Sequence, residues 1–143
     1  MSGTYVSSAL RRQVYERVGG ACEYCQMPEA MAFSPHQIDH IIAQKHGGTT
    51  QADNLALACA LCNKHKGSDI ASIDPEIDEI IALYHPRKQR WVEHFQLNPS
   101  GNILPLTGIG RVTVSLLQLN RAERVAERQI LMQAGLLSSP GLT

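Results

Sequence analysis

Cys22-Glu-Tyr-Cys25 and Cys59-Ala-Leu-Cys62 are the stretches that decide the fold of this chain of 143 residues. They contain all four of its cysteines, as two C-x-x-C pairs. A gap of two residues allows both sulfurs of a pair to bind one ion, and a tetrahedral ion takes four such ligands. The 33 residues between the pairs exceed the spacing of about 15–20 that is usual in a zinc ribbon. The spacing therefore predicts a structural zinc site whose two halves are separated by a folded segment.

The cysteines also permit two other interpretations, namely two pairs of free thiols or one redox-active pair. A thioredoxin-like redox motif lies in a βαβ context, and the sequence around these pairs has no such pattern. Disulfides are rare in a reducing compartment, where C-x-x-C pairs more often bind metal. Structural zinc is the favoured interpretation.

The composition is that of one globular domain. Hydrophobic residues make up 43% of the chain, and 13 basic residues balance 13 acidic ones. A net charge of zero argues against a protein that coats nucleic acid through bulk charge, but it is compatible with an enzyme that has a local positive strip.

The sequence predicts no membrane association. No apolar stretch approaches the roughly 20 residues that span a bilayer. The N-terminal residues lack a basic segment followed by an apolar one, so we expect no signal peptide and a cytoplasmic location.

The segments around the cysteines show short elements of both kinds. Apolar residues recur at helical spacing before Gly19-Gly20, and isoleucines follow one another around residue 40. The expected elements are a helix over residues 8–18, a strand over 37–42, and a short helix that opens at Asp53 or Asn54 and runs through Leu57 and Cys59 to Gly67.

The C-terminal half predicts a hairpin and further helices. Asp74-Pro75-Glu76 has the residues of a helix start, and apolar residues follow it at i, i+3, i+4 and i+7. The expected elements are a helix from Asp74 to Tyr84, a β-hairpin over 91–106 with its turn at 98–101, a helix capped by Thr107, and a last helix from Asn120 to about Gln133.

Basic residues of this half have two interpretations. Those at 87, 88 and 90, beside Trp91, could hold a nucleic-acid backbone and stack a base. A solvated turn before a core tryptophan is favoured over that role. Arg121, Arg124 and Arg128 alternate with glutamates, which is typical of an exposed helix face.

The segment between the cysteine pairs and just after them carries the polar residues of interest. Each has an ordinary explanation when taken alone, because asparagines often cap helices and a single histidine is more often structural than catalytic. Neighbouring side chains of a strand point to opposite faces. Asp39 and His40 would therefore need a local distortion to share a ligand, or they would serve one site from different angles.

The motifs occur in the order Cys22-x-x-Cys25, Asp39-His40, Gly47-Gly48, Asp53-Asn54-Leu55, and Cys59-x-x-Cys62-Asn63-x-x-Lys66-Gly67. In this order they resemble the four-cysteine branch of the HNH endonuclease family. The resemblance implies an α+β fold with a ββα-metal (His-Me finger) core and structural zinc, flanked by an N-terminal helix and by a C-terminal hairpin plus helices. It implies one nuclease domain over residues 1–143, with its motif core at about 20–67 and an extension over about 70–137.

The resemblance also implies a role for each motif residue. His40 would be the general base, and histidine suits proton transfer near neutral pH. Asp39 and Asn63 would bind a catalytic divalent ion, and Asn54 would orient the His40 ring. Many relatives have histidine where this chain has Asn63. Two oxygen ligands favour Mg²⁺ or Mn²⁺ over zinc.

The function implied is a metal-dependent endonuclease that hydrolyses phosphodiester bonds of nucleic acid, with DNA as the expected substrate. Candidate phosphate contacts are Lys45, Lys64 and Lys66, and His65 competes for a metal or phosphate contact. A zinc-stabilised binding module without catalysis is the alternative from another class, and a thiol redox protein is a third.

Overall fold

The computed structural model describes residues 5–140, and contacts divide the chain into two compact units. The first unit contains the described residues up to Ile70 together with His85–Lys88. The second contains Ala71–Tyr84 and the described residues from Gln89 onward. The first boundary falls just beyond the predicted motif core. The single domain expected over residues 1–143 stays a prediction.

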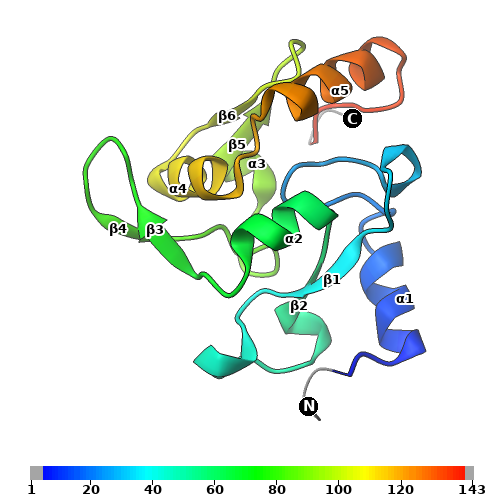
Figure 1. Cartoon of the computed structure of the whole chain (residues 1–143), viewed down its shortest axis with the longest axis vertical. Coiled ribbons are helices and arrows are strands. Elements are labelled where there is room, and N and C mark those ends of the chain that lie inside the picture. Colours follow the sequence, from blue (N-terminus) through cyan, green and yellow to red (C-terminus); the bar gives the residue numbers. More distant parts are fainter. Residues whose placement is uncertain (1–4, 141–143) are drawn as a thin grey trace. The chain divides into compact units, whose positions relative to one another are not determined.

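The first unit is built around a small antiparallel sheet (Figure 1). Strand β1 (Gln37–His40) pairs with β2 (Leu55–Ala58), with Gln37 opposite Ala58 and His40 opposite Leu55. Helix α1 packs on β2 through Val14, which is fully buried. The elements are α1 (Ser8–Glu16), η2 (Glu29–Met31), β1 (Gln37–His40), η3 (Gln44–His46), η4 (Ala52–Asn54), β2 (Leu55–Ala58) and α2 (Ala60–Lys66).

Residues 55–58 form a strand, so the helix expected to run through Leu57 is wrong in its first half. All four residues of the strand are buried. Leucine and alanine favour helices, but pairing with β1 gives their backbone groups partners and packing buries their side chains, which outweighs that preference. The helix begins only after Cys59, whose sulfur accepts a hydrogen bond from the Cys62 amide at its N-terminus.

The described residues of the second unit form two further hairpins and three helices. Of the hairpin predicted over 91–106, residues 95–105 form the paired strands β5 (Phe95–Leu97) and β6 (Ile103–Pro105), whereas Trp91–His94 form the short helix α3. The two C-terminal helices are confirmed, and Thr107 caps the first of them, α4 (Gly108–Leu117), through the Gly110 amide. Its elements are β3 (Ala71–Ile73), β4 (Ile80–Ala82), α3 (Trp91–His94), β5 (Phe95–Leu97), β6 (Ile103–Pro105), α4 (Gly108–Leu117) and α5 (Ala122–Gln133). Mixed helices and small antiparallel sheets confirm the α+β class.

The helix predicted from Asp74 is wrong, because β3 and β4 form a hairpin there. The Asp74 carboxylate accepts a hydrogen bond from the Glu76 amide at 3.0 Å, which closes a turn. The same carboxylate lies 2.8 Å from the guanidinium of Arg111. Ile80 is 76% exposed, so the isoleucines do not form one buried stripe. A polar turn anchored to α4 therefore replaces the expected helix.

Two polar residues near α5 differ from their predicted roles. Asn120, the predicted start of the last helix, lies before α5, and its side chain accepts from the amide of Ile103 and donates to its carbonyl. Arg128 is fully buried, although its spacing predicted an exposed face. Its guanidinium donates to the carbonyls of Gly101 and Leu119, each at 2.7 Å. These bonds tie α5 to the turn of the β5–β6 hairpin and to the residues that follow α4.

Trp91 belongs to the core of this unit. Its ring lies 5.1 Å from that of Phe95, and the residue is 8% exposed. The interpretation as a core tryptophan therefore fits better than base stacking. Among the described residues, no helix combines the length and the apolar composition that crossing a bilayer requires.

Arg128→Leu should destabilise the second unit strongly. Both carbonyl groups would lose their donor inside the fold, which costs roughly 2–6 kcal/mol for the two together. Urea unfolding followed by circular dichroism measures the change. Arg121→Leu is the matched control, because its ion pair with Glu123 is partly exposed and should contribute at most about 1 kcal/mol. Equal losses in both variants would contradict the structural role given to Arg128.

Candidate metal centre and the polar network beside it

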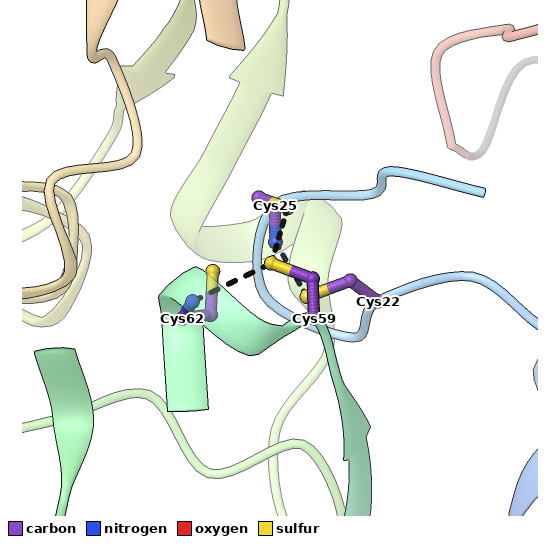
Figure 2. Close-up of side chains that lie close together, drawn as sticks. All are labelled: Cys22, Cys25, Cys59 and Cys62. Atoms are coloured by element: carbon purple, nitrogen blue, oxygen red, sulfur yellow. Dashed lines mark hydrogen bonds between the residues drawn. The ribbon is translucent and has the colours of Figure 1, made fainter. Parts of the chain in front are cut away.

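The four cysteines lie at one place in the first unit (Figure 2). Their sulfurs are all within 4.8 Å of one another, and each residue is buried. Cys22 and Cys25 come from the turn after α1. Cys59 and Cys62 come from the junction of β2 and α2. The structure therefore brings together the two pairs that the sequence separates, and they can hold a metal ion.

The geometry of the sulfurs fits a tetrahedral ion. The Cys25 and Cys59 sulfurs are 3.6 Å apart, too far for a disulfide. A zinc–sulfur bond of about 2.3 Å gives a tetrahedron with edges of about 3.8 Å. The amide of Cys25 points at the sulfur of Cys22, and that of Cys62 at the sulfur of Cys59, each at 3.4 Å. Such bonds stabilise thiolates, which are the metal-binding form.

The four thiols do not ionise alike, because hydrogen bonds with the neighbouring sulfur of Cys22 lower the pKa of Cys25 and Cys59. Desolvation is the largest cause that raises the pKa of the Cys22 thiol well above its ordinary value. A bound cation would reverse that preference by stabilising the thiolate.

The turn that carries the first pair is fixed to the sheet. The Glu23 amide donates to the Leu57 carbonyl, and the Leu57 amide donates to the Glu23 carboxylate, each at 2.8 Å. Arg87 forms an ion pair with the other oxygen of the same carboxylate. Burial lowers the pKa of Arg87 to about 10, which leaves it charged at neutral pH. The two hydrogen bonds between Glu23 and Leu57 therefore hold the cysteine turn to β2, and Arg87 balances the charge of the Glu23 carboxylate.

Asp39 lies beside the cysteine site and is 4% exposed. One carboxylate oxygen accepts from the Tyr24 hydroxyl at 2.9 Å, and the other lies 3.2 Å from the Lys66 ammonium. Burial is the largest influence on the pKa of Asp39 and raises it, while Lys66 and Tyr24 act in the opposite direction. Burial raises the pKa of Tyr24 well above its ordinary value, so its hydroxyl stays protonated and donates.

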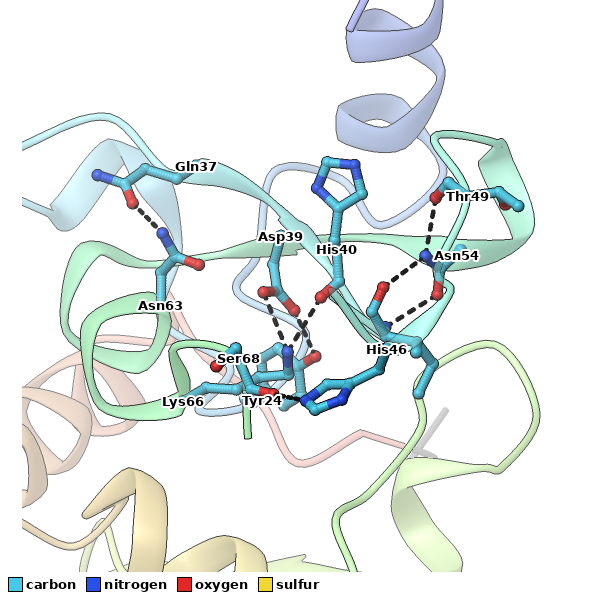
Figure 3. A network of polar contacts seen from close by, with 11 residues as sticks. Tyr24, Gln37, Asp39, His40, His46, Thr49, Asn54, Asn63, Lys66 and Ser68 are labelled. Carbon is cyan, nitrogen blue, oxygen red and sulfur yellow. Dashed lines mark hydrogen bonds and ion pairs between the residues drawn. The ribbon is translucent and has the colours of Figure 1, made fainter. Parts of the chain in front are cut away.

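His40 points to the other side of β1 from Asp39 (Figure 3). The strand runs regularly through both residues, so the local distortion considered from the sequence does not occur. The Nε2 atom of His40 lies 2.9 Å from the hydroxyl of Thr50, and the ring is half-buried. The backbone carbonyl of His40 accepts from the Lys66 ammonium at 3.0 Å. Lys66 therefore links Asp39 to the end of the strand that carries His40.

Asn54 closes the loop between β1 and β2. Its side-chain oxygen accepts from the Ile42 amide, and its nitrogen donates to the carbonyls of Ile42 and Thr49, at 2.8–2.9 Å. Gly48 makes this closure possible, because a Cβ there would lie 1.6 Å from the Ile42 carbonyl oxygen. Asn54 is 7% exposed, so its side chain holds the backbone of the loop and does not face solvent.

Asn63 and the three candidate lysines differ in their contacts and in their exposure to solvent. The Asn63 amide donates to the side chain of Gln37 and makes no hydrogen bond to Asp39. Lys45 and Lys64 are exposed, as a phosphate contact requires. Lys66 is only 1% exposed and is held by Asp39, so its position differs from the surface position expected of it. The motif that contains Lys66 indicated that this lysine matters, but it did not predict that the side chain is buried.

Sequence reasoning missed Tyr24, Thr50 and Glu23. Tyr24 and Glu23 were visible only as the two residues inside the first C-x-x-C pair. Their contacts depend on how that turn meets β1 and β2, which spacing alone does not give. Thr50 follows Gly47-Gly48 and carried no signal of its own.

A family model described as HNH endonuclease matches residues 22–69. This confirms, over that segment, the resemblance indicated by the motifs, and it supports nuclease-type activity or nucleic-acid binding. Searches of curated proteins and of solved structures gave no match.

Cys25→Ser should release the ion and destabilise the first unit. One of four sulfur ligands would be lost, and such sites contribute several kcal/mol or more to folding. Elemental analysis should fall from about one metal per chain to near zero, and thermal unfolding should shift down. Met31→Ser is a control for loss of an apolar side chain, because Met31 lies outside the site and is 47% exposed. Wild-type chain that is folded, reduced and free of metal would contradict the assignment.

Proposed function

We propose that this chain, whose residues 22–69 match the HNH endonuclease family, is a metal-dependent endonuclease that hydrolyses phosphodiester bonds, with DNA as its substrate. In this proposal β1, β2 and α2 form a ββα-metal core. Zinc occupies the four-cysteine site, and Asp39 and Asn63 hold Mg²⁺ or Mn²⁺. A cytoplasmic location belongs to the same proposal.

The observation that carries the proposal is the grouping of the motif residues on three adjoining elements. His40 and Asp39 lie on β1, Asn54 ends the turn before β2, and Asn63 lies on α2. α2 contacts both strands. A structural role alone does not require a half-exposed histidine at the end of a strand with an asparagine closing the loop behind it. General-base catalysis requires both a fixed ring and access to water.

His40 is suited to activate water through Nδ1. If Nε2 donates to the Thr50 hydroxyl at 2.9 Å, the lone pair of the neutral imidazole is on Nδ1. That nitrogen has no hydrogen-bond partner among the described residues. Asn54 acts indirectly, because its three backbone bonds fix the loop from which Thr50 meets the ring.

The oxygen donors of Asp39 and Asn63 suit a hard divalent ion. Such an ion, when bound, would offset the charge that develops on the scissile phosphate and the leaving oxygen. Tyr24 and Lys66 hold the Asp39 carboxylate on the side of β1 opposite to the His40 ring.

The loop between β1 and β2 offers candidate contacts for nucleic acid. A pocket of about 230 Å³ is lined in part by the Gly47–Gly48–Thr49 loop, His46, His85 and Lys88. Lys45 lies beside this loop and is exposed. Phosphate contacts of this kind give affinity without sequence specificity.

A zinc-stabilised nucleic-acid-binding module is the second candidate. The ion pair between Asp39 and Lys66 favours it, because the carboxylate already has two partners within the chain. Nicking of supercoiled plasmid in Mg²⁺ or Mn²⁺ separates the two candidates. Binding without nicking under both metals would support the module.

His40→Ala should lower the cleavage rate by about 10²–10⁴-fold, the usual contribution of a general base. DNA affinity should change little, since it comes mainly from phosphate contacts. The nicking rate, DNA binding and thermal unfolding are measured on the same preparation. His94→Ala is the control, because His94 is a half-buried histidine of the second unit that has no role in the proposed site. Cleavage at the wild-type rate by folded His40→Ala would remove His40 from the mechanism.

Asp39→Asn should raise the metal concentration needed for half-maximal cleavage by at least about tenfold, since even outer-shell changes cost 10–100-fold. Asparagine keeps an acceptor for one of the two donors and avoids a cavity beside Lys66. Asn63→Ala should act in the same direction. Asp69→Asn, at an exposed carboxylate, is the control. Unchanged metal dependence in both site variants would show that the ligands are misassigned.

A further inference from the structure

We infer that Tyr24 is a positioning residue for the catalytic metal, acting through the hydrogen bond from its hydroxyl to Asp39. The inference rests on the proposed function, in which Asp39 binds the catalytic ion. It assigns a second task to the first C-x-x-C turn, which delivers two sulfur ligands and also fixes the carboxylate of a different metal site.

The contact is well defined. The Tyr24 side chain is 1% exposed, and its hydroxyl lies 2.9 Å from the Asp39 Oδ2 atom. The other oxygen, Oδ1, is held by Lys66 at 3.2 Å. Two donors, one on each oxygen, fix both the position and the rotation of the carboxylate. Each oxygen still has a lone pair for a metal ion, because a carboxylate accepts about four hydrogen bonds or metal bonds in all.

The two donors come from the two halves of the cysteine site. Tyr24 lies between Cys22 and Cys25, and Lys66 follows Cys62 on the same helix. Closure of the four sulfurs around one ion therefore also brings both donors to Asp39. Figure 3 shows the tyrosine and the lysine reaching the carboxylate on the same side of β1.

The hydroxyl is the part of Tyr24 that this role requires. The ring alone would fill the buried space between the turn and β1. Tyr24→Phe removes the hydrogen bond and keeps the ring. A structural role predicts that this variant loses stability or zinc. A positioning role predicts instead a selective loss of affinity for the catalytic metal, because partners of a ligand orient it and typically contribute 10–100-fold to metal affinity.

The experiment measures Mn²⁺ binding to the zinc-loaded full chain without DNA, by titration calorimetry or electron paramagnetic resonance. Zinc content and thermal unfolding are measured on the same samples, and plasmid nicking is measured across a range of Mn²⁺ concentrations. Tyr84→Phe is the matched control, because Tyr84 is another buried tyrosine, at 4% exposure, in the second unit. Tyr24→Met replaces Tyr24→Phe if the phenylalanine variant does not fold.

The expected result is Mn²⁺ affinity lowered by about 10–100-fold in Tyr24→Phe with zinc content unchanged. Nicking should then recover toward the wild-type rate at high Mn²⁺, and Tyr84→Phe should match the wild type. Unchanged Mn²⁺ affinity in Tyr24→Phe, or an equal loss in Tyr84→Phe, would overturn the inference while leaving the nuclease proposal intact. Wild-type chain that neither binds Mn²⁺ nor nicks DNA would overturn the proposed function, and the inference with it.

Discussion

The meeting of four sulfurs within 4.8 Å is the constraint on which the first unit depends. Between the two cysteine pairs run β1, the Asn54 loop and β2, so one site closes a segment of more than thirty residues. A flexible loop of that length loses considerable entropy on closure, and an ion that binds both ends offsets this cost. The small apolar cluster around Val14 and Leu57 could not supply this closure alone.

Two ion pairs lie near the cysteine site, and they have different roles. Glu23 and Arg87 form a pair whose purpose is structural, since its carboxylate also holds the backbone of β2. Asp39 and Lys66 form a pair inside the motif itself. Buried pairs of this kind add little net stability but fix geometry, because removing either partner leaves an uncompensated charge. Lys66 fixes the Asp39 carboxylate and, through the His40 carbonyl, the end of β1.

Sequence reasoning was most successful where chemistry requires a particular spacing. The four cysteines, the helix before Gly19-Gly20 and the Thr107 cap depend on contacts within a few residues or on ligand number, and these were predictable. The helices predicted to start at Asp53 or Asn54 and at Asp74 rested on cap-like residues followed by apolar ones, yet strand pairing and the Asp74 turn prevailed over residues 55–58 and 71–82. The burial of Lys66 and Arg128 could not be predicted, since long cationic side chains are usually exposed and their partners are distant in sequence.

The short segment His85–Lys88 belongs to the first unit, while the residues on either side of it belong to the second. The chain therefore leaves the first unit, returns to it and leaves again. The first unit cannot be separated by a single cut after residue 70, because the cut would remove Arg87 and leave the buried Glu23 carboxylate without its cation. Residues 85–88 of the C-terminal extension therefore belong to the unit that contains the motif core. Any exchange of the C-terminal extension between related chains would have to keep Arg87, because Glu23 depends on it for its ion pair.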